Sequence, residues 1–315
     1  MWFILDAVDQ LDLSSFYRRY RADGWGRAAY PPKTMVALLL YAYCTGIRSS
    51  RKIEQACQEN VAFKVITGNK VPDHTTISRF RQKFQEELSG LFTEVLWLCG
   101  RAGLVKVGTV VVDGTKMAGN ASLSANRTWR HLEEEVERML KEAEEVTQDQ
   151  NDVRQLHPTL KRAKEELEGA GIKKRPKVAV ADAGYFSEGN IKGADPDGPE
   201  LLVAPASDWR LARKLAEEGS PRGRIPQGLS ARELMERRLL TKRGQALYGP
   251  RKVVEAVVGQ VKALGDRFMR RGRRAARSEF RLLCACHNLL KLWRAVLAGV
   301  ARKWKRITEP LPQPA

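Results

Sequence analysis

Residues 107–117, VGTVVVDGTKM, and residues 177–186, KVAVADAGYF, decide the fold class of this chain. Each stretch holds a short apolar run that ends in an aspartate, Asp113 in the first and Asp182 in the second. A continuous apolar run that is bounded by a turn signal is typical of a buried strand. A third run, ELLVAP, follows at residues 200–205, and helical patterns separate the first two runs. We therefore expect an α/β domain whose strands deliver acids at their carboxyl ends.

Charge is the second informative feature of the sequence. The 315 residues are 43% apolar, which is enough for real cores, and carry a net charge of +18 with a pI near 9.9. Such an excess predicts a polyanionic partner, nucleic acid first and a membrane surface as the weaker alternative. No apolar run reaches membrane-spanning length, and no signal peptide opens the chain. Five scattered cysteines favour a reducing cytosol, so we expect a cytoplasmic, nucleoid-associated protein.

Residues 1–105 have the patterns of a helical DNA-binding domain. The segment PPKTMVALLLYAYCTG (31–46) begins with proline and ends at glycine, and SSRKIEQACQEN (49–60) opens with two N-cap candidates. A third segment, PDHTTISRFRQKF (72–84), can be capped by Asp73 and carries apolar residues at helical spacing. Its outward cations are Arg79, Arg81 and Lys83. This succession predicts a helix-turn-helix reader, although an ordinary amphipathic helix has the same periodicity.

The rest of the chain divides less clearly. Residues 106–300 are predicted to form one catalytic domain, with a helical insertion at about 127–172, and residues 301–315 a basic, proline-containing tail. The stretch 207–244 is polar and broken by prolines and glycines, so we interpret it as a loop-rich connector. Near the end, CAC at 284–286 precedes a histidine, but the spacing fits no zinc pattern, which indicates core residues of a final helix.

Three acids form the candidate chemical site. Asp113 and Asp182 end strands, and Glu255 lies on the later helical segment RKVVEAVVGQVKALG (251–265). Carboxylates that hold two divalent ions can activate a water or a 3′-hydroxyl, and oxygen ligands suit Mg²⁺ or Mn²⁺. Each acid also has a simpler explanation. Asp-Gly is ordinary turn chemistry, and Glu255 can form a helix-surface pair with Arg251 four residues earlier.

Tyr248, Arg251, Glu255 and Lys262 resemble, at the expected spacing, the Tyr-Arg-Glu-Lys signature of bacterial insertion-sequence transposases of the Asp-Asp-Glu (DDE) type. VVVDGTKM resembles the first aspartate motif of these enzymes and ADAGYFSEGN the second. Residues 51–84 are similar to their N-terminal DNA-binding region, and EFRLLCACHNLLKLW (279–293) is similar to their C-terminal helix. The resemblance therefore extends over most of the chain.

The resemblance implies a ribonuclease-H-like domain that cleaves and transfers DNA strands. Asp113, Asp182 and Glu255 would hold two Mg²⁺ or Mn²⁺ ions. Tyr248, Arg251 and Lys262 would contact DNA ends and phosphates. The implied partner is double-stranded DNA, both the terminal inverted repeats of the element and its target, and the implied assembly is a homodimer on that DNA.

One departure from the family pattern leaves alternatives open. Residues 117–176 contain nothing like the antiparallel strand pair expected between the first two acids, which suggests that residues have been lost near Glu144 to Val146. The loss would leave the Asp113 strand at an edge. An impaired, internally deleted remnant that only binds DNA is therefore the alternative to an active transposase. A nuclease that acts on RNA in hybrids is a third interpretation.

Overall fold

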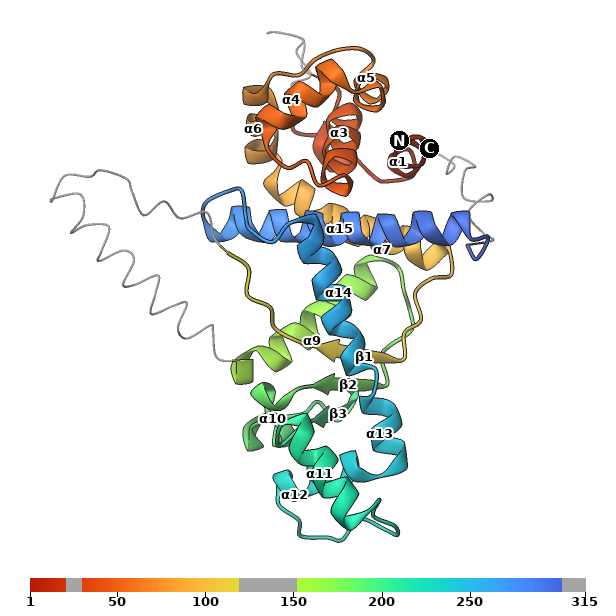
Figure 1. Cartoon of the computed structure of the whole chain (residues 1–315), viewed down its shortest axis with the longest axis vertical. Helices are drawn as coiled ribbons and strands as arrows, with labels where there is room; N and C mark the ends of the chain where they lie inside the picture. The colour runs from red at the N-terminus through yellow and green to blue at the C-terminus, as the bar shows by residue number, and fades with distance from the viewer. Residues whose placement is uncertain (21–29, 119–151, 302–315) are drawn as a thin grey trace, which may run out of the picture.

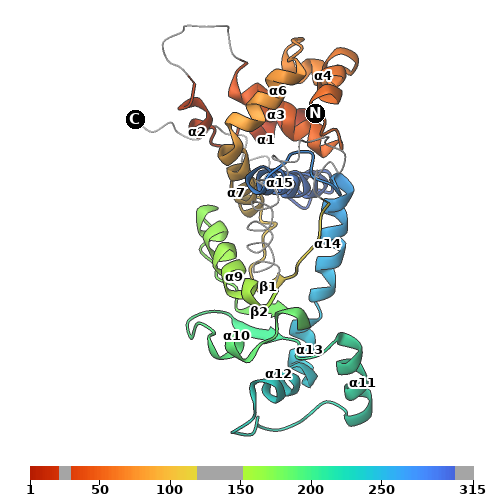
Figure 2. The same ribbon diagram turned by 90° about the vertical axis from the view of Figure 1, so that its left-hand side faces the viewer.

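The structure is a computed structural model that describes residues 1–20, 30–118 and 152–301 (Figure 1). The molecule is elongated, with a helical unit at one end and a small sheet covered by helices at the other. Helix α15 (Arg273–Leu297) lies across the chain between the two parts, and α14 (Arg251–Leu264) runs from the sheet region to α15 in both views (Figures 1 and 2). No helix in the described part of the chain combines the length and apolar character needed to cross a membrane.

Seven helices of the first hundred residues form the helical unit. They are α1 (Trp2–Val8), α2 (Ser14–Tyr17), α3 (Pro32–Cys44), α4 (Ser50–Glu59), α5 (Val61–Thr67), α6 (His74–Lys83) and α7 (Gln85–Arg101). Helix α3 is buried along most of its length and begins at Pro32, whose fixed φ suits a first helical turn. It ends before Gly46, which has a φ of +79° that other residues rarely adopt. Both ends agree with the prediction from sequence.

Helix α6 is capped by Asp73, as predicted. The Asp73 carboxylate accepts hydrogen bonds from the backbone N–H groups of Thr75, at 2.8 Å, and Thr76, at 2.9 Å. This cap satisfies donors that the first turn of a helix leaves without partners. The inner stripe of Ile77, Phe80 and Phe84 is buried, which confirms the apolar periodicity.

The core of the helical unit includes helix α15. Leu282, Leu283, Cys286 and Leu289 of α15 belong to the same buried cluster as the residues of α3 and α7. Helix α15, which falls within the predicted catalytic domain 106–300, thus packs against the N-terminal helices. The prediction that the CAC segment is core material is confirmed, since Cys286 is fully buried, and all five cysteines are free.

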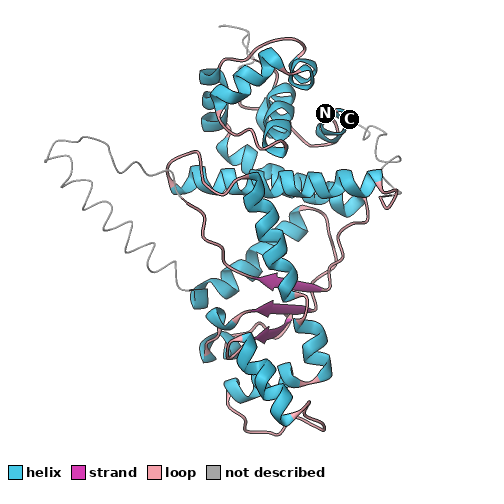
Figure 3. Ribbon diagram, viewed as in Figure 1, coloured by secondary structure: helices cyan, strands magenta, loops and turns pink. Residues whose placement is uncertain are grey.

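The sheet has three parallel strands in the order β1 (Thr109–Val112), β2 (Val178–Ala181) and β3 (Glu200–Val203) (Figure 3). All three lie where the apolar runs predicted them. Side chains alternate between the two faces because the period of a strand is two residues. Ala179 and Ala181 face one core with Leu156, while Val178 and Val180 face the other.

Helices cover both faces of this sheet. On one face lie α9 (Asp152–Gly169), the short 3₁₀ helix η1 (Ala183–Tyr185) and α10 (Glu188–Lys192). On the other lie α11 (Asp208–Glu218), α12 (Ala231–Leu240) and α13 (Lys242–Tyr248). The result is a helix-rich α/β architecture in three layers.

The expectation of a loop-rich connector at 207–244 was wrong. The stretch holds α11, α12 and the start of α13, and its prolines and glycines cluster in the turn between α11 and α12. Ser230 and Glu233 form a capping box at the start of α12, a signal that was visible in the sequence. Leu211 and Leu239 from these helices are buried against the sheet.

The predicted loss of two strands falls mainly outside the described residues. Residues 119–151, which include the first part of the predicted insertion, are not described. Residues 302–315, all but the first residue of the predicted tail, are not described either. The described part of the insertion contains α9, which confirms a helix there. Among the described strands, β1 pairs with β2 alone and therefore lies at an edge.

Candidate active site

Asp113 and Asp182 lie side by side at the carboxyl edge of the sheet. The last residues of their strands, Val112 and Ala181, are paired in the parallel register. Each aspartate is the next residue along its strand, so the register brings the two acids to the same edge. The Asp182 carboxylate accepts a hydrogen bond from the N–H of Gly184 at 3.0 Å and caps η1.

The charges of Glu255 and Arg251 both influence the Asp113 carboxyl group. Burial raises the pKa of the Asp113 carboxyl, and the negative charges of Asp182 and, to a smaller extent, Glu255 raise it further. The Arg251 cation and a hydrogen bond at Gly114 oppose this rise. Like charges that share a site disfavour ionisation of one another. The other two predicted acids and the predicted arginine therefore act on the Asp113 carboxyl group, although they come from segments far apart in sequence.

The structure does not contain the ion pair that would explain Glu255 as an ordinary helix-surface residue. Arg251 does not pair with Glu255. Its Nη2 atom donates to Asp208 Oδ2 at 2.9 Å, and Glu255 is exposed on α14. The Arg251 side chain is only 13% exposed.

Asp208 is a residue that the sequence reasoning missed. It is the first residue of α11, shortly after β3, and its carboxylate accepts the Tyr248 hydroxyl at 3.2 Å as well as the Arg251 guanidinium. The Arg251 Cζ atom lies 5.9 Å from the centre of the Tyr248 ring. Burial and the Asp208 charge raise the pKa of Tyr248. The local signal for it was weak, because Asp208 comes five residues after the end of β3, whereas Asp113 and Asp182 directly follow their strands.

Asp152, the first residue of α9, is a second missed acid. A Cβ atom placed on Gly114 would lie 3.4 Å from Asp152 Oδ1, and one on Gly184 would lie 3.3 Å from Asp152 Oδ2. The two glycines that follow the strand acids therefore leave room for this carboxylate. Burial, with the charges of Asp152, Asp182 and Asp113, raises the pKa of Tyr185 to about 12. The acids thus surround a buried tyrosine.

The other predicted contacts lie elsewhere. Lys262 is half-buried in the last turn of α14, two turns from Glu255 and close to α15. Arg79 and Lys83 are exposed on α6, and the Lys83 amine lies 5.2 Å from the centre of the Phe84 ring.

Arg81 corrects the prediction of an outward cation. It is 6% exposed, and its guanidinium donates to the Tyr43 hydroxyl at 3.1 Å and to the Arg48 carbonyl at 2.8 Å. The reason is helical geometry, because Arg81 lies four residues after Ile77 and three before Phe84, on the inner face.

The donor set suits a hard divalent ion in its chemistry. All of the acids are oxygen donors, which Mg²⁺ and Mn²⁺ prefer. Within residues 1–20, 30–118 and 152–301, however, no three His, Cys, Asp or Glu side chains lie close enough together to hold a metal ion. The carboxylates are electrostatic neighbours rather than a closed set of ligands.

Parallel strands that end in acids, covered on both faces by helices, are consistent with the catalytic domain of a DDE transposase. Comparison with known families agrees: residues 135–289 match the family model of a transposase DDE domain, and residues 3–83 match that of a transposase domain, DUF772. The two matches cover about three quarters of the chain and together indicate an insertion-sequence transposase of the DDE family. The DDE match includes Asp182 and Glu255 and begins after Asp113. Neither a curated protein nor a solved structure matches the chain.

Proposed function

We propose that this transposase binds the terminal repeats of an insertion sequence and cleaves and transfers DNA strands with the help of divalent ions. The observation that carries the proposal is the parallel register that pairs Val112 with Ala181 and so brings Asp113 and Asp182 to the same edge of the sheet. The charges of Asp182 and Glu255 also raise the pKa of the Asp113 carboxyl. Crowded carboxylates repel each other, and a bound cation removes that repulsion.

Asp113, Asp182 and Glu255 would hold Mg²⁺ or Mn²⁺ in a two-ion site of the ribonuclease-H-like kind. Such ions, when bound, activate the attacking oxygen and stabilise the leaving oxygen. The chain must keep the Asp113 carboxyl ionised, and the nearby Arg251 cation favours that form. The Gly184 N–H holds the Asp182 carboxylate in place at the end of β2.

Arg251 and Tyr248 would orient the phosphate to be cleaved. The Nε atom of Arg251 is buried and has no hydrogen-bond partner within the described residues. A buried donor without a partner is costly, and a phosphate oxygen would satisfy it. Asp208 holds the other side of the guanidinium and leaves this N–H available. Lys262, farther along the same helix, would contact the backbone of the same DNA.

Duplex DNA would be read by α6 through Arg79 and Lys83, while Arg81 supports that helix from inside. Each cation that neutralises a phosphate releases counterions, so binding should weaken steeply with salt. We propose that two copies pair two DNA ends and act on the DNA of the nucleoid.

The test uses duplexes from both flanks of the coding sequence, with Mn²⁺ or Mg²⁺ and the full chain. We expect cutting at defined ends by the wild type and none by Asp182→Asn, with DNA binding retained by both. Asp197→Asn is the matched control, because Asp197 is exposed and lies before β3, at the opposite edge of the sheet. Cutting that persists in Asp182→Asn would refute the proposed triad.

A second candidate is a protein that occupies the same ends without cutting them. The observation that favours it is the spacing of the acids, none of which form a group of three at metal-holding distance in the described residues. End-specific binding by the wild type without cutting in either ion would support this candidate. Absence of both binding and cutting would refute both.

A further inference from the structure

The segment just before and at the start of α15 is the most basic part of the described chain. It has no role in the site proposed above. Residues 267–277, which we name the arginine segment, hold six arginines and no acid within eleven residues. Arg271, Arg273, Arg274 and Arg277 are exposed.

Two cavities share the arginine segment as a wall. The first, of about 730 Å³, lies between the segment and the end of α6 and is lined by Ser78, Arg81, Gln82 and Arg270 among others. The second, of about 660 Å³, lies between the segment and the loop after Asp113 and is lined by Thr115, Met117 and Arg162. Arg273 and Arg274 line both. The segment therefore spans the distance from the predicted reader helix to the catalytic loop.

Backbone hydrogen bonds fix the segment at the catalytic end. The Phe268 N–H donates to the carbonyl of Ala118 at 2.9 Å, and Ala118 pairs with Arg267 as a parallel bridge. Ala118 lies five residues after Asp113. The loop that carries the first acid is thus tied directly to the arginine segment.

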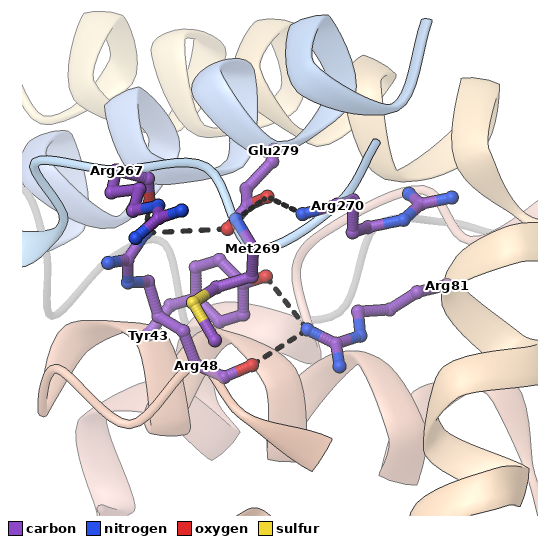
Figure 4. A network of polar contacts seen from close by, with 7 residues as sticks. All are labelled: Tyr43, Arg48, Arg81, Arg267, Met269, Arg270 and Glu279. Atoms are coloured by element: carbon purple, nitrogen blue, oxygen red, sulfur yellow. Dashed lines mark hydrogen bonds and ion pairs between the residues drawn. The ribbon is translucent and has the colours of Figure 1, made fainter. Parts of the chain in front are cut away.

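Polar contacts fix the segment at the helical end (Figure 4). The buried Glu279 carboxylate accepts the N–H groups of Met269, at 3.0 Å, and Arg270, at 3.3 Å, and pairs with Arg48 at 3.4 Å. Arg270 also donates to the Gln85 side chain at 2.8 Å. The backbone of the segment is thus held in place beside both cavities.

The first cavity has an unsatisfied donor in its wall. Arg81 is 6% exposed, and its Nε atom is buried without a hydrogen-bond partner in the described part of the chain. Burial and the adjacent Arg81 charge lower the pKa of Arg270. A bound anion would accept a hydrogen bond from the buried N–H and would reduce the repulsion between the two guanidinium groups.

We propose that the arginine segment binds the phosphodiester backbone of a DNA strand as it passes from α6 to the Asp113 loop. The inference rests on the proposed function and adds the route of the DNA between the two parts of the molecule. A polymer fits better than a small anion, because the cations continue from one cavity to the next. Arginine also suits phosphate through its planar pair of donors.

The test is the salt dependence of binding to a short fluorescein-labelled duplex of mixed sequence, measured by anisotropy with the full chain. Arg271→Gln/Arg274→Gln should weaken binding and reduce the slope of log K against log salt by about two, since each arginine neutralises one phosphate. Arg271→Lys/Arg274→Lys keeps the charges and should keep most of the slope. The control Arg222→Gln/Arg224→Gln makes the same charge change in the exposed turn between α11 and α12 and should keep the wild-type slope.

The outcomes separate this inference from the proposed function. A wild type that binds duplex with a slope unaffected by Arg271→Gln/Arg274→Gln overturns the route and leaves the transposase proposal intact. An equal decrease in the Arg222/Arg224 control shows a general effect of net charge and also overturns the route. A wild type that does not bind duplex overturns both. Circular dichroism of each variant confirms that the fold is retained.

Discussion

Asp208 connects two residues of the predicted signature, and its removal gives a calculable effect. Asp208→Asn keeps the shape of the side chain but removes the charge that pairs with Arg251. A hydrogen bond to a charged group contributes about 1.5–3 kcal/mol, whereas exposed ion pairs contribute about 0–1 kcal/mol because water screens them. Here the arginine is 13% exposed and the aspartate 42%. The pair lies between these limits, so we expect a coupling energy of about 1–1.5 kcal/mol.

A double-mutant cycle measures this coupling and excludes other effects of the substitution. Urea unfolding, followed by circular dichroism, is compared for the wild type, Asp208→Asn, Arg251→Gln and the double variant. Asp208 also lies in the first turn of α11, where a negative charge favours the helix dipole by about 0.3–1 kcal/mol. The cycle cancels that contribution, since it is absent from both variants that carry Asp208→Asn.

The hydrogen bond from Tyr248 sharpens the prediction. Asp208→Ala also removes the acceptor of the Tyr248 hydroxyl, a neutral donor worth about 1 kcal/mol. With the Arg251 pair and the helix-dipole contribution included, its total cost should be about 2.5–3.5 kcal/mol, greater than that of Asp208→Asn. A coupling energy within the ~0.3 kcal/mol typical of independent sites would falsify the claim that Asp208 holds Arg251 in position.

Three further predictions concern the framework. Leu283→Ala, at a fully buried position of α15, should lower the free energy of unfolding by about 2–5 kcal/mol. The control Leu297→Ala, at a position 68% exposed on the same helix, should change it by less than about 0.5 kcal/mol. Equal urea midpoints for the two variants would contradict the packing of α15 on the N-terminal helices. Gly244→Ala should destabilise the fold by about 1–3 kcal/mol in thermal melts, because its Cβ would lie 1.9 Å from the Arg238 carbonyl oxygen. Gly259→Ala, with open space around it, should be neutral or stabilising in the same assay. Burial raises the pKa of Glu279 above its ordinary 4.5. The wild type should therefore gain stability relative to Glu279→Gln as the pH falls from above the raised pKa to about 4.5. If the stability difference between the two proteins is constant or has the opposite trend across that pH range, the carboxyl is not buried in the folded state.

The strands and their acids were predictable because the signals are local. Each strand is a short apolar run that ends in a turn, and Asp113 and Asp182 follow directly in the sequence. The cap at Asp73 was equally local, since a carboxylate can reach only the N–H groups of the next few residues. The position of Arg81 could also have been found, because helical spacing places it on the inner face with Ile77.

The missed features depend on contacts between distant segments. Nothing in 207–244 indicated that Asp208 would reach Tyr248 and Arg251, more than thirty residues later in the chain. The stretch was interpreted as loop because its prolines and glycines outweighed two short helices. Their apolar residues become decisive only when the sheet is present to bury them.

By itself, then, the amino-acid sequence determined the class of fold, the positive charge, the acids at the strand ends and the resemblance that the family comparisons support. Tertiary structure decided which of these residues meet. The register of β1 against β2 put Asp113 beside Asp182, and the path of α14 brought Glu255 and Arg251 toward them. It also joined α15 to the first hundred residues and placed the arginine segment between α6 and the loop after Asp113. The physical reason is that strand, helix and cap signals act over a few residues, whereas charge grouping and core packing depend on distances in space.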